Sequence, residues 1–271
     1  MTYLVCNVCG RPLKQHNGLS DNCSLSYGTE QGIPFFKNVS ALQPAEERIR
    51  DMQSGTYLAH TKIDSQTKFI RRFINSLDTA HRDSAIVLDL GCGPGPTVSL
   101  LREAGYTQIT AIDFSADSLL INKRSNPADT IDWLSADLLT LKAVPDAVDL
   151  LLMSDFIQHV GTYTDKLQLL QNAIEALKSG GSFFISFFNF NIVNFLKGDL
   201  RGNFENGAIQ YERLLAKEML QLIAKSVVIK RHYAMNITHN YQIDNWLGRL
   251  PGAAFIGRMY AIEGIRKPHT R

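Results

Sequence analysis

The residues that point most directly to chemistry lie in one glycine-rich segment, Val87-Leu-Asp-Leu-Gly-Cys-Gly-Pro-Gly-Pro-Thr. Gly91, Gly93 and Gly95 have no Cβ atom, so the backbone can turn tightly there and a ligand can approach it closely. The spacing is GxGxG. Pro96 takes the place of the third glycine of a dinucleotide fingerprint, and no GK[ST] follows, so neither nucleotide-binding pattern is matched. The segment therefore predicts a ligand-binding turn of another kind.

The two prolines of this segment narrow the class of ligand. Loops that bind a pyrophosphate offer backbone N–H donors at the start of a helix. Pro94 and Pro96 have no N–H group, so two such donors are missing. A ligand without phosphate therefore fits this loop better than NAD, FAD or ATP. The alternative is a tight turn that binds nothing.

Acidic residues follow at the ends of the next two expected strands. Asp113 stands 18 residues after Gly95, where a carboxylate can accept hydrogen bonds from both hydroxyls of a ribose. Asp137 is predicted to accept a hydrogen bond from an adenine amino group, with the Leu138 backbone N–H facing a ring nitrogen. The alternatives are a helix cap for Asp113 and a surface carboxylate that caps a loop for Asp137.

Apolar segments that alternate with helical ones must position these residues. The sequence predicts strands at 85–90, 108–113, 131–138, 148–153 and 182–188. It predicts helical structure from about 43 to 77, with a one-faced apolar pattern at 69–77, and helices at 96–103, 116–123 and 165–177. Strands that are apolar throughout and alternate with helices indicate a parallel sheet covered on both faces. The predicted fold class is therefore α/β, with a doubly wound, mostly parallel sheet. The glycine segment joins the first strand to its helix, where open sheets of this kind bind ligands.

The composition divides the chain into two parts. Residues 1–42 form a small segment that is dense in Cys, Gly, Asn and Ser, and residues 43–271 form one larger domain. Within that domain we predict a core at 85–189, a substrate-facing insertion at 189–225 that includes a helix over 210–224, and final strands within 226–267. The insertion begins with a segment, 189–206, that we expect to cover the acceptor site as a lid or wall.

Residues 85–189 resemble the core of a class I S-adenosylmethionine-dependent methyltransferase, the Rossmann-like type shared by ubiquinone-pathway and other small-molecule methyltransferases. The resemblance rests on the glycine segment, Ala111-Ile-Asp-Phe-Ser, Ser135-Ala-Asp-Leu, Asp149-Leu-Leu-Leu-Met-Ser-Asp-Phe-Ile-Gln-His-Val and Ala176-Leu-Lys-Ser-Gly-Gly-Ser-Phe-Phe-Ile-Ser. It implies an enzyme that uses S-adenosyl-L-methionine as its methyl donor.

The resemblance also implies a set of cofactor contacts. Asp89 and Gly91 match residues near the amino-acid end of the cofactor, and Asp113 matches the ribose contact. Asp137 matches the adenine contact. The remaining contacts that it implies are Cys92, Gly93 and Gly95 in the loop, Phe114 against the adenine, Leu138 beside it, Met153 through its backbone, and Tyr57 over the methionine end.

His159 is the residue that the resemblance suggests as a general base. The family often has a histidine in a Glu-His or Gln-His pair after its fourth strand, and Gln158-His159 follows the expected strand at 148–153. The methyl group of a sulfonium is already activated, so alignment of the acceptor can supply most of the rate. An acceptor hydroxyl also needs a base, and histidine titrates near neutral pH. The alternatives are Asp155 as the base, or a histidine that is held by loop backbone and shapes the pocket floor.

Three cysteines in the first 23 residues predict a metal site. Cys6-Asn-Val-Cys9 has the spacing of a zinc knuckle, in which two thiolates share one tetrahedral ion, and Cys23 adds a third thiol. The second knuckle is incomplete, because Ser26 stands where a fourth cysteine is expected, and His16 is the candidate for the fourth ligand. The segment resembles the small zinc ribbons ahead of some methyltransferase domains. The alternative is a ribbon without metal that is held only by packing.

Charge and composition exclude other classes of protein. The 271 residues include 28 basic and 26 acidic side chains, so neither a basic nucleic-acid coat nor an acidic tail describes the chain. Four cysteines do not make a disulfide framework, and no apolar run reaches membrane-spanning length. Because the first residues also lack the pattern of a signal peptide, we predict a cytoplasmic protein without membrane contact. No feature of the sequence indicates an oligomeric state.

The leading hypothesis is an enzyme that methylates a small molecule or natural-product intermediate. Similar ribbons precede certain ribosomal RNA guanine methyltransferases, so an RNA methyltransferase that recognises its substrate through the ribbon is the first alternative. Residues 1–51 carry five basic and five acidic side chains, whereas phosphate contacts need clustered cations. The second alternative, a non-catalytic partner protein with the same fold, is disfavoured by the intact glycine segment and its acids.

Overall fold

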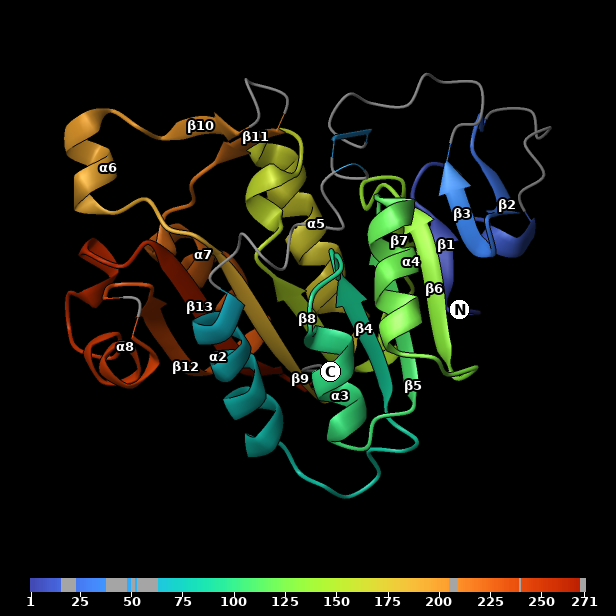
Figure 1. Cartoon of the computed structure of the whole chain (residues 1–271), viewed down its shortest axis with the longest axis horizontal. Helices are drawn as coiled ribbons and strands as arrows, with labels where there is room; N and C mark the ends of the chain where they lie inside the picture. Colours follow the sequence, from blue (N-terminus) through green and yellow to red (C-terminus); the bar gives the residue numbers. More distant parts are fainter. Residues whose placement is uncertain are drawn as a thin grey trace.

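A nine-stranded sheet forms the centre of the molecule (Figure 1). The computed structural model describes residues 1–15, 23–37, 48, 49, 52, 63–204, 209–238 and 240–268. The strands, in their order across the sheet, are β12 (Val227–Met235), β13 (Met259–Arg266), β9 (Leu177–Phe188), β8 (Val148–Ser154), β4 (Ile86–Leu90), β5 (Gln108–Asp113), β6 (Ile131–Ala136), β3 (Ile33–Lys37) and β2 (Ser26–Glu30).

The middle of this sheet is parallel, as the apolar strand segments predict. β9, β8, β4, β5, β6 and β3 run in one direction, whereas β13 is antiparallel to both β9 and β12. Parallel sheets are usually covered on both faces, and β4 is an example. Four of its five residues are buried, so other elements cover both of its faces. The predicted α/β class with a doubly wound, mostly parallel sheet is confirmed.

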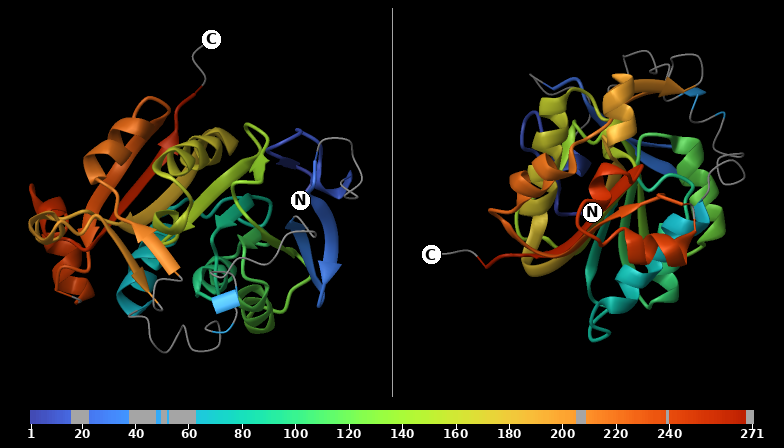
Figure 2. Two further views of the ribbon diagram at one scale, coloured as in Figure 1. Left: turned by 90° about the horizontal axis from the view of Figure 1, so that it is seen from above. Right: turned by 90° about the vertical axis from the view of Figure 1, so that its left-hand side faces the viewer.

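Helices cover both faces of the sheet (Figure 2). Successive residues of β4 point to opposite faces: Val87 belongs to one buried apolar cluster, and Leu88 and Leu90 belong to the other. The first cluster contains residues of α2 (Ile63–Ser76), α3 (Thr97–Glu103) and α4 (Ala116–Ser125), and the second contains residues of α5 (Tyr163–Ala176) and α7 (Ala216–Ile223). No helix within the described ranges has both the length and the apolar character needed to cross a membrane.

The N-terminal segment extends this sheet. β3 pairs in parallel with the end of β6 and forms a hairpin with β2, while β1 (Leu4–Cys6) pairs with β7 (Leu141–Ala143) in a small separate sheet. The strands of residues 1–37 therefore pack on the larger domain and continue its sheet. The expected boundary at residue 42 lies outside the described residues, and the division into 1–42 and 43–271 stays a prediction.

The segment after β9 differs from what the sequence predicts. It contains α6 (Ile192–Lys197) and an antiparallel hairpin of β10 (Arg201–Phe204) and β11 (Ile209–Glu212). The helix predicted over 210–224 begins only at Ala216, so its first part was wrong. Residues 209–212 are extended because they pair with β10, a contact that local helical spacing does not reveal.

An ion pair fastens this hairpin to the domain. Lys166 of α5 is 1% exposed, and its Nζ atom lies 3.3 Å from Oε2 of Glu212 and 3.0 Å from the carbonyl oxygen of Gly161. Burial lowers the pKa of Lys166, whereas the hydrogen bond and the charge of Glu212 act in the opposite direction and favour the ammonium form. Glu212 also accepts a hydrogen bond of 3.0 Å from Nε of Arg201 in β10.

We expect Glu212→Gln to lower the free energy of unfolding by about 2 to 3 kcal/mol, because it leaves the buried Lys166 ammonium without its counter-charge. Lys166→Met replaces the buried charge by an apolar side chain of similar volume and should cost about 1 kcal/mol or less. Urea unfolding at neutral pH measures both. Equal losses in the two variants would show that the hairpin is not held by this ion pair.

Candidate active site

The glycine loop leaves β4 at Leu90 and enters α3 at Thr97. Gly91 and Gly93 have φ angles of 69° and 51°, in the region that glycine adopts without strain. The N–H group of Gly91 donates to the carbonyl oxygen of Ile112 at 2.8 Å, and that of Gly93 donates to Oδ2 of Asp113 at 2.9 Å. The carboxyl end of β5 therefore holds the loop that leaves β4.

Asn122 of α4 holds the loop from its other side. Its side-chain amide donates to the carbonyl oxygens of Gly93 at 2.8 Å and Gly95 at 3.4 Å, and the residue is 1% exposed. Sequence reasoning missed Asn122, because a single asparagine within a helix has no spacing that would distinguish it. The sequence gives one indication of Asn122, which is that a polar residue stands at a position of the expected helix 116–123 where a buried residue is expected.

The space beside Gly91 is filled by protein. A Cβ atom on Gly91 would lie 2.3 Å from Cγ of Phe156, so the aromatic ring packs directly against the loop. At Gly93 and Gly95 the nearest atoms would lie 3.9 and 3.5 Å away, which is ordinary contact distance. The requirement for glycine at position 91 thus comes from Phe156 and the φ angle, and the sequence did not reveal this contact between the two residues.

Asp89 lies beneath this loop without a complete set of partners. It is 1% exposed, and its Oδ2 atom has no hydrogen-bond partner among the described residues. Burial, and then the negative charge of Asp113, raises the pKa of Asp89 to about 8. The site therefore contains a buried carboxyl group that would be stabilised as a carboxylate by a cation.

The carboxylate of Asp113 has hydrogen-bond partners at both of its oxygen atoms, in contrast to that of Asp89. It is 8% exposed, and its carboxylate accepts hydrogen bonds from the N–H groups of Gly93 and Ser115, each at 2.9 Å. Each carboxylate oxygen has room for more than one donor. Asp113 therefore orders the glycine loop and the start of α4 at the edge where a ribose contact is predicted.

The other predicted contacts fall on the same edge of the sheet. Phe114 follows β5 and is half-buried, Asp137 follows β6 and is exposed, and Met153 of β8 is fully buried next to Leu90 of β4. The Oδ1 atom of Asp137 accepts a hydrogen bond of 2.9 Å from the N–H group of Leu139. The carboxyl ends of β4, β5, β6 and β8 thus bring these residues together. Tyr57 lies outside the described residues.

His159 lies in a short 3-10 helix, η2 (Ile157–His159), after β8. Its Nδ1 atom is 2.9 Å from the carbonyl oxygen of Gln210 in the insertion hairpin. The ring makes edge contacts with Phe188 and Tyr211, with centroids 5.9 and 6.3 Å away. Because a carbonyl only accepts, Nδ1 carries the proton, and the basic lone pair of the neutral ring is on Nε2.

A strained turn aims η2 toward the glycine loop. Asp155 has a φ of 57°, an uncommon conformation that costs about 1 to 2 kcal/mol for a residue with a side chain. The next residue is Phe156, which packs on Gly91, and His159 follows three residues later. His159 therefore belongs to the edge that carries the loop. Phe188 and Tyr211 were missed by sequence reasoning because only the fold brings them to it.

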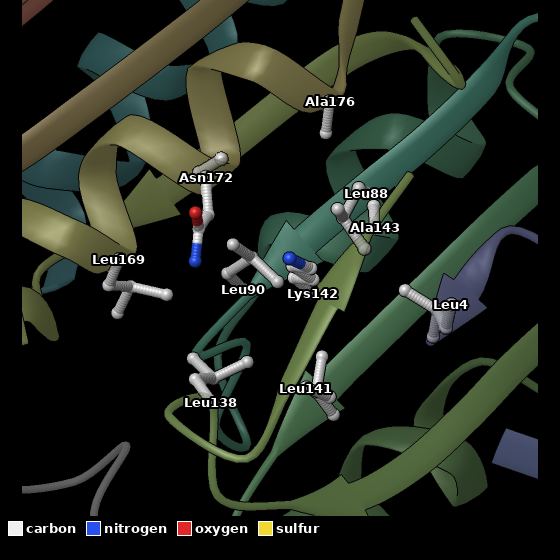
Figure 3. A pocket seen from close by; sticks show the side chains of 11 residues that line it. Leu4, Leu88, Leu90, Leu138, Leu141, Lys142, Ala143, Leu169, Asn172 and Ala176 are labelled. Atoms are coloured by element: carbon white, nitrogen blue, oxygen red, sulfur yellow. The ribbon is translucent and has the colours of Figure 1, made fainter. Parts of the chain in front are cut away.

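The pocket in Figure 3 lies on the α5 face of the sheet, away from the predicted cofactor contact of Asp89. It is lined mainly by leucine and alanine side chains, including Leu88 and Leu90 of β4, Leu138, and Leu4 of β1. Asp89, between the two β4 leucines, points to the opposite face. The Leu138 side chain therefore anchors the loop after β6 in an apolar cluster, away from the predicted adenine contact of its backbone.

The three N-terminal cysteines converge. The sulfur atoms of Cys6, Cys9 and Cys23 all lie within 4.8 Å of one another. Burial raises the pKa of Cys6 to about 11, whereas the backbone N–H of Arg11 lowers the pKa of Cys9 to about 7. Three such thiols are a donor set that zinc prefers. His16, the predicted fourth ligand, lies outside the described residues.

Part of the chain is similar to known methyltransferases. Residues 88–185 match a family model described as a methyltransferase domain. The crystal structure of the N-methyltransferase NodS from Bradyrhizobium japonicum, in complex with S-adenosyl-L-homocysteine, has a TM-score of 0.55 at 12% identity and covers 83% of this chain and 100% of that one. Residues 88–185 thus match a methyltransferase domain, and the chain has the fold of an S-adenosylmethionine-dependent methyltransferase, as the resemblance of residues 85–189 implies.

Two curated relatives share part of the sequence. Trans-aconitate 2-methyltransferase of Azoarcus sp. is 34% identical over 101 residues, which is 36% of this chain and 37% of that protein. Ubiquinone biosynthesis O-methyltransferase of Idiomarina loihiensis is 28% identical over 145 residues, 50% of this chain and 58% of that protein. The matched region therefore spans less than two thirds of either relative.

S-adenosylmethionine is the cofactor of this class of domain, and the residues at the loop fit it. The cofactor has an α-ammonium group, which suits the buried Asp89 carboxyl group that lacks a partner at Oδ2. It has no phosphate, which suits a loop from which Pro94 and Pro96 remove two N–H donors.

Proposed function

We propose that this protein is an enzyme that transfers a methyl group from S-adenosylmethionine to a small-molecule acceptor. The observation that carries the proposal is the buried Asp89 carboxyl group, with Oδ2 unpartnered, beneath a glycine loop at the carboxyl end of β4. A site that merely closes a turn would not keep a costly buried carboxyl group without a second partner.

In this proposal each acid contacts one part of the cofactor. Asp89 balances the charge of the α-ammonium group, Asp113 accepts from the ribose hydroxyls, and Asp137 accepts from the adenine amino group. The Leu138 backbone N–H faces an adenine nitrogen. The remaining contacts are those of the loop residues Gly91, Cys92, Gly93 and Gly95, and of Phe114 and Met153.

The bound cofactor supplies an electrophilic methyl group on a sulfonium. The protein then has to hold the acceptor in line with that methyl group and to exclude water. His159 has the second task of removing a proton from an acceptor hydroxyl through Nε2, since its Nδ1 proton is directed at the carbonyl oxygen of Gln210.

Phe188 and Tyr211 support a small organic acceptor. Their ring centroids lie 5.4 Å apart, and both rings contact the imidazole of His159. An aromatic wall of this kind suits a compact apolar or aromatic body better than a phosphate backbone. One of the two curated relatives is named for methylation of trans-aconitate, and the other is named for O-methylation in ubiquinone biosynthesis. Both names support a small-molecule acceptor.

Titration calorimetry and a transfer assay test the proposal. We expect S-adenosylhomocysteine to bind with micromolar affinity, and NAD and FAD not to bind. Labelled methyl transfer is then measured to a panel of organic acids and phenols, with transfer RNA and ribosomal RNA as the competing class. Transfer to RNA alone would replace the small-molecule assignment, and failure to bind S-adenosylhomocysteine would overturn the whole proposal.

The role of His159 is tested by measuring turnover and cofactor binding separately in a variant. We expect His159→Gln to lower kcat on a hydroxyl acceptor by about 100- to 1,000-fold, with an unchanged Kd for S-adenosylhomocysteine, because general-base catalysis contributes about this much. The decline of the rate at acidic pH should disappear in the variant. Turnover at the wild-type rate with saturating acceptor would show that His159 only shapes the site.

A further inference from the structure

The spacing of the three thiols is that of ligands around one ion. In a tetrahedral zinc site with Zn–S bonds of about 2.3 Å, neighbouring sulfur atoms lie about 3.8 Å apart. The sulfur atoms of Cys6 and Cys23 are 3.7 Å apart, and Cys9 brings its sulfur atom within 4.8 Å of both. Small movements of the exposed Cys9 would therefore complete three of the four ligand positions.

The backbone around these cysteines has the form of a metal knuckle. The N–H group of Val8 donates to the sulfur atom of Cys6 at 3.3 Å, and that of Gly10 donates to the carbonyl oxygen of Cys6 at 2.9 Å. Gly10 has a φ of 76°, which allows the chain to turn back after Cys9. Hydrogen bonds to sulfur stabilise the thiolate form that a metal needs.

The knuckle contacts the loop after β6 directly. Asn7, between the two knuckle cysteines, donates from its backbone to the carbonyl oxygen of Thr140 at 2.8 Å and from its side chain to that of Leu139 at 3.1 Å. The same loop contains Asp137, whose carboxylate accepts from the N–H group of Leu139. One residue therefore connects the thiol cluster to the loop of the predicted adenine contact.

Two further contacts join the N-terminal segment to this loop. Phe35 and Phe36 of β3 pair with Ser135 and Ala136, the last residues before Asp137. Leu4 of β1 lines the apolar pocket that also takes the Leu138 side chain (Figure 3). Three contacts thus hold the loop at 137–140: the pairing of β6 with β3, the buried side chain of Leu138, and the hydrogen bonds from the knuckle.

We propose that a zinc ion bound by Cys6, Cys9 and Cys23 fixes the knuckle and, through Asn7, holds the loop at 137–140 in the geometry that binds the adenine end of the cofactor. Metal content then sets cofactor affinity. The second half of this inference rests on the proposed function, whereas the metal site itself does not.

Elemental analysis, hydrogen exchange and calorimetry test the proposal on the full chain. We expect one zinc per chain in the wild-type protein and none in Cys9→Ser, in which an exposed ligand is lost without disturbing the buried pair. In Cys9→Ser, amide exchange should accelerate at 137–143 but not in β13. The Kd for S-adenosylhomocysteine should rise about ten-fold, and removal of zinc from the wild-type protein with a chelator should reproduce both changes.

Asn7→Ala tests the hydrogen bond between the knuckle and the loop without removing a metal ligand. We expect this variant to keep its zinc while the Kd rises about three-fold, because only the hydrogen bond to Leu139 is removed. Val8→Ala, a change at the neighbouring exposed position, is the matched control and should alter neither zinc content nor Kd. An unchanged Kd and unchanged exchange after zinc loss would overturn the proposed link between knuckle and loop.

Zinc-free wild-type protein that takes up no zinc ion after reduction would overturn the metal site. If the zinc-loaded protein instead fails to bind S-adenosylhomocysteine, the proposed function fails, and the exchange rates at 137–143 still decide whether zinc holds the loop. The two failures therefore have different signatures.

Discussion

Gly91→Ala is expected to raise the Kd for S-adenosylhomocysteine by at least about 100-fold. The new Cβ atom would lie 2.3 Å from Cγ of Phe156, and the residue has a φ of 69°. The backbone conformation alone costs about 1 to 2 kcal/mol, and forcing the ring aside adds about 1 to 3 kcal/mol. Relief of this clash must move either η2 or the loop, and both belong to the cofactor edge. Calorimetry measures the Kd, and thermal unfolding reports the cost to stability.

Two further variants keep this prediction falsifiable if Gly91→Ala folds poorly. Gly105→Ala is the matched control, because Gly105 also has a positive φ, 95°, but a Cβ atom there would meet nothing within 4 Å. It should lose stability without losing affinity. Adding Phe156→Ala to Gly91→Ala removes the clash and should recover part of the affinity. Binding by Gly91→Ala at wild-type strength would show that the loop geometry does not control the site.

The sequence was sufficient for the centre of the fold because the information there is local. Each parallel strand is a short apolar run, and each lies next to a helix with one apolar face, so β4, β5, β6, β8 and β9 could all be predicted. The acids at their ends could also be located, since the carboxyl ends of parallel strands meet at one edge. Asp89 and Asp113 are both found there.

What the sequence could not predict depends on contacts between distant residues. β3 pairs with β6 across 100 residues, from Phe35 to Ser135, and no local pattern of the N-terminal segment reveals this partner. The hairpin of β10 and β11 replaced part of a predicted helix for the same reason. Phe156 was visible within a motif, but its contact with Gly91 appears only when β8 is placed beside β4.

Asp89 and Asp113 show how one edge gives two acids different roles. The Asp113 carboxylate accepts hydrogen bonds from two backbone N–H groups, which stabilise its charge whether or not a ligand is bound. Asp89 has an oxygen without a partner, and burial raises its pKa to about 8. Folding without the cofactor therefore favours a neutral Asp89, whereas binding of a cation favours its charged form.

Asp89→Asn is therefore expected to stabilise the ligand-free protein while raising the Kd for S-adenosylhomocysteine by about 100-fold, the loss of a buried charge-assisted hydrogen bond of about 3 kcal/mol. The raised pKa means that folded protein holds a proton that unfolded protein releases above a pH of about 4. Wild-type stability thus falls as pH rises from about 4 to 8. The advantage of the variant should therefore grow by about 4 kcal/mol between pH 5 and pH 8, at about 1.4 kcal/mol per pH unit.

The proton on Asp89 also links cofactor affinity to pH, but affinity changes with pH in the opposite direction to stability. Below pH 8 the wild-type protein must release the Asp89 proton when the ammonium group binds, so its affinity should increase from pH 6 to 8 and then level off. Calorimetry in two buffers of different ionisation enthalpy detects this proton, and Asp89→Asn should release none. Asp149→Asn is the control, because Asp149 is paired with Lys178 at 2.8 Å and lies away from the loop; it should lose stability and keep its affinity. A variant at position 89 that unfolds more easily at pH 8 yet binds like the wild type would mean that the Asp89 carboxyl group serves packing alone, and the cofactor site would have to be sought elsewhere on the sheet.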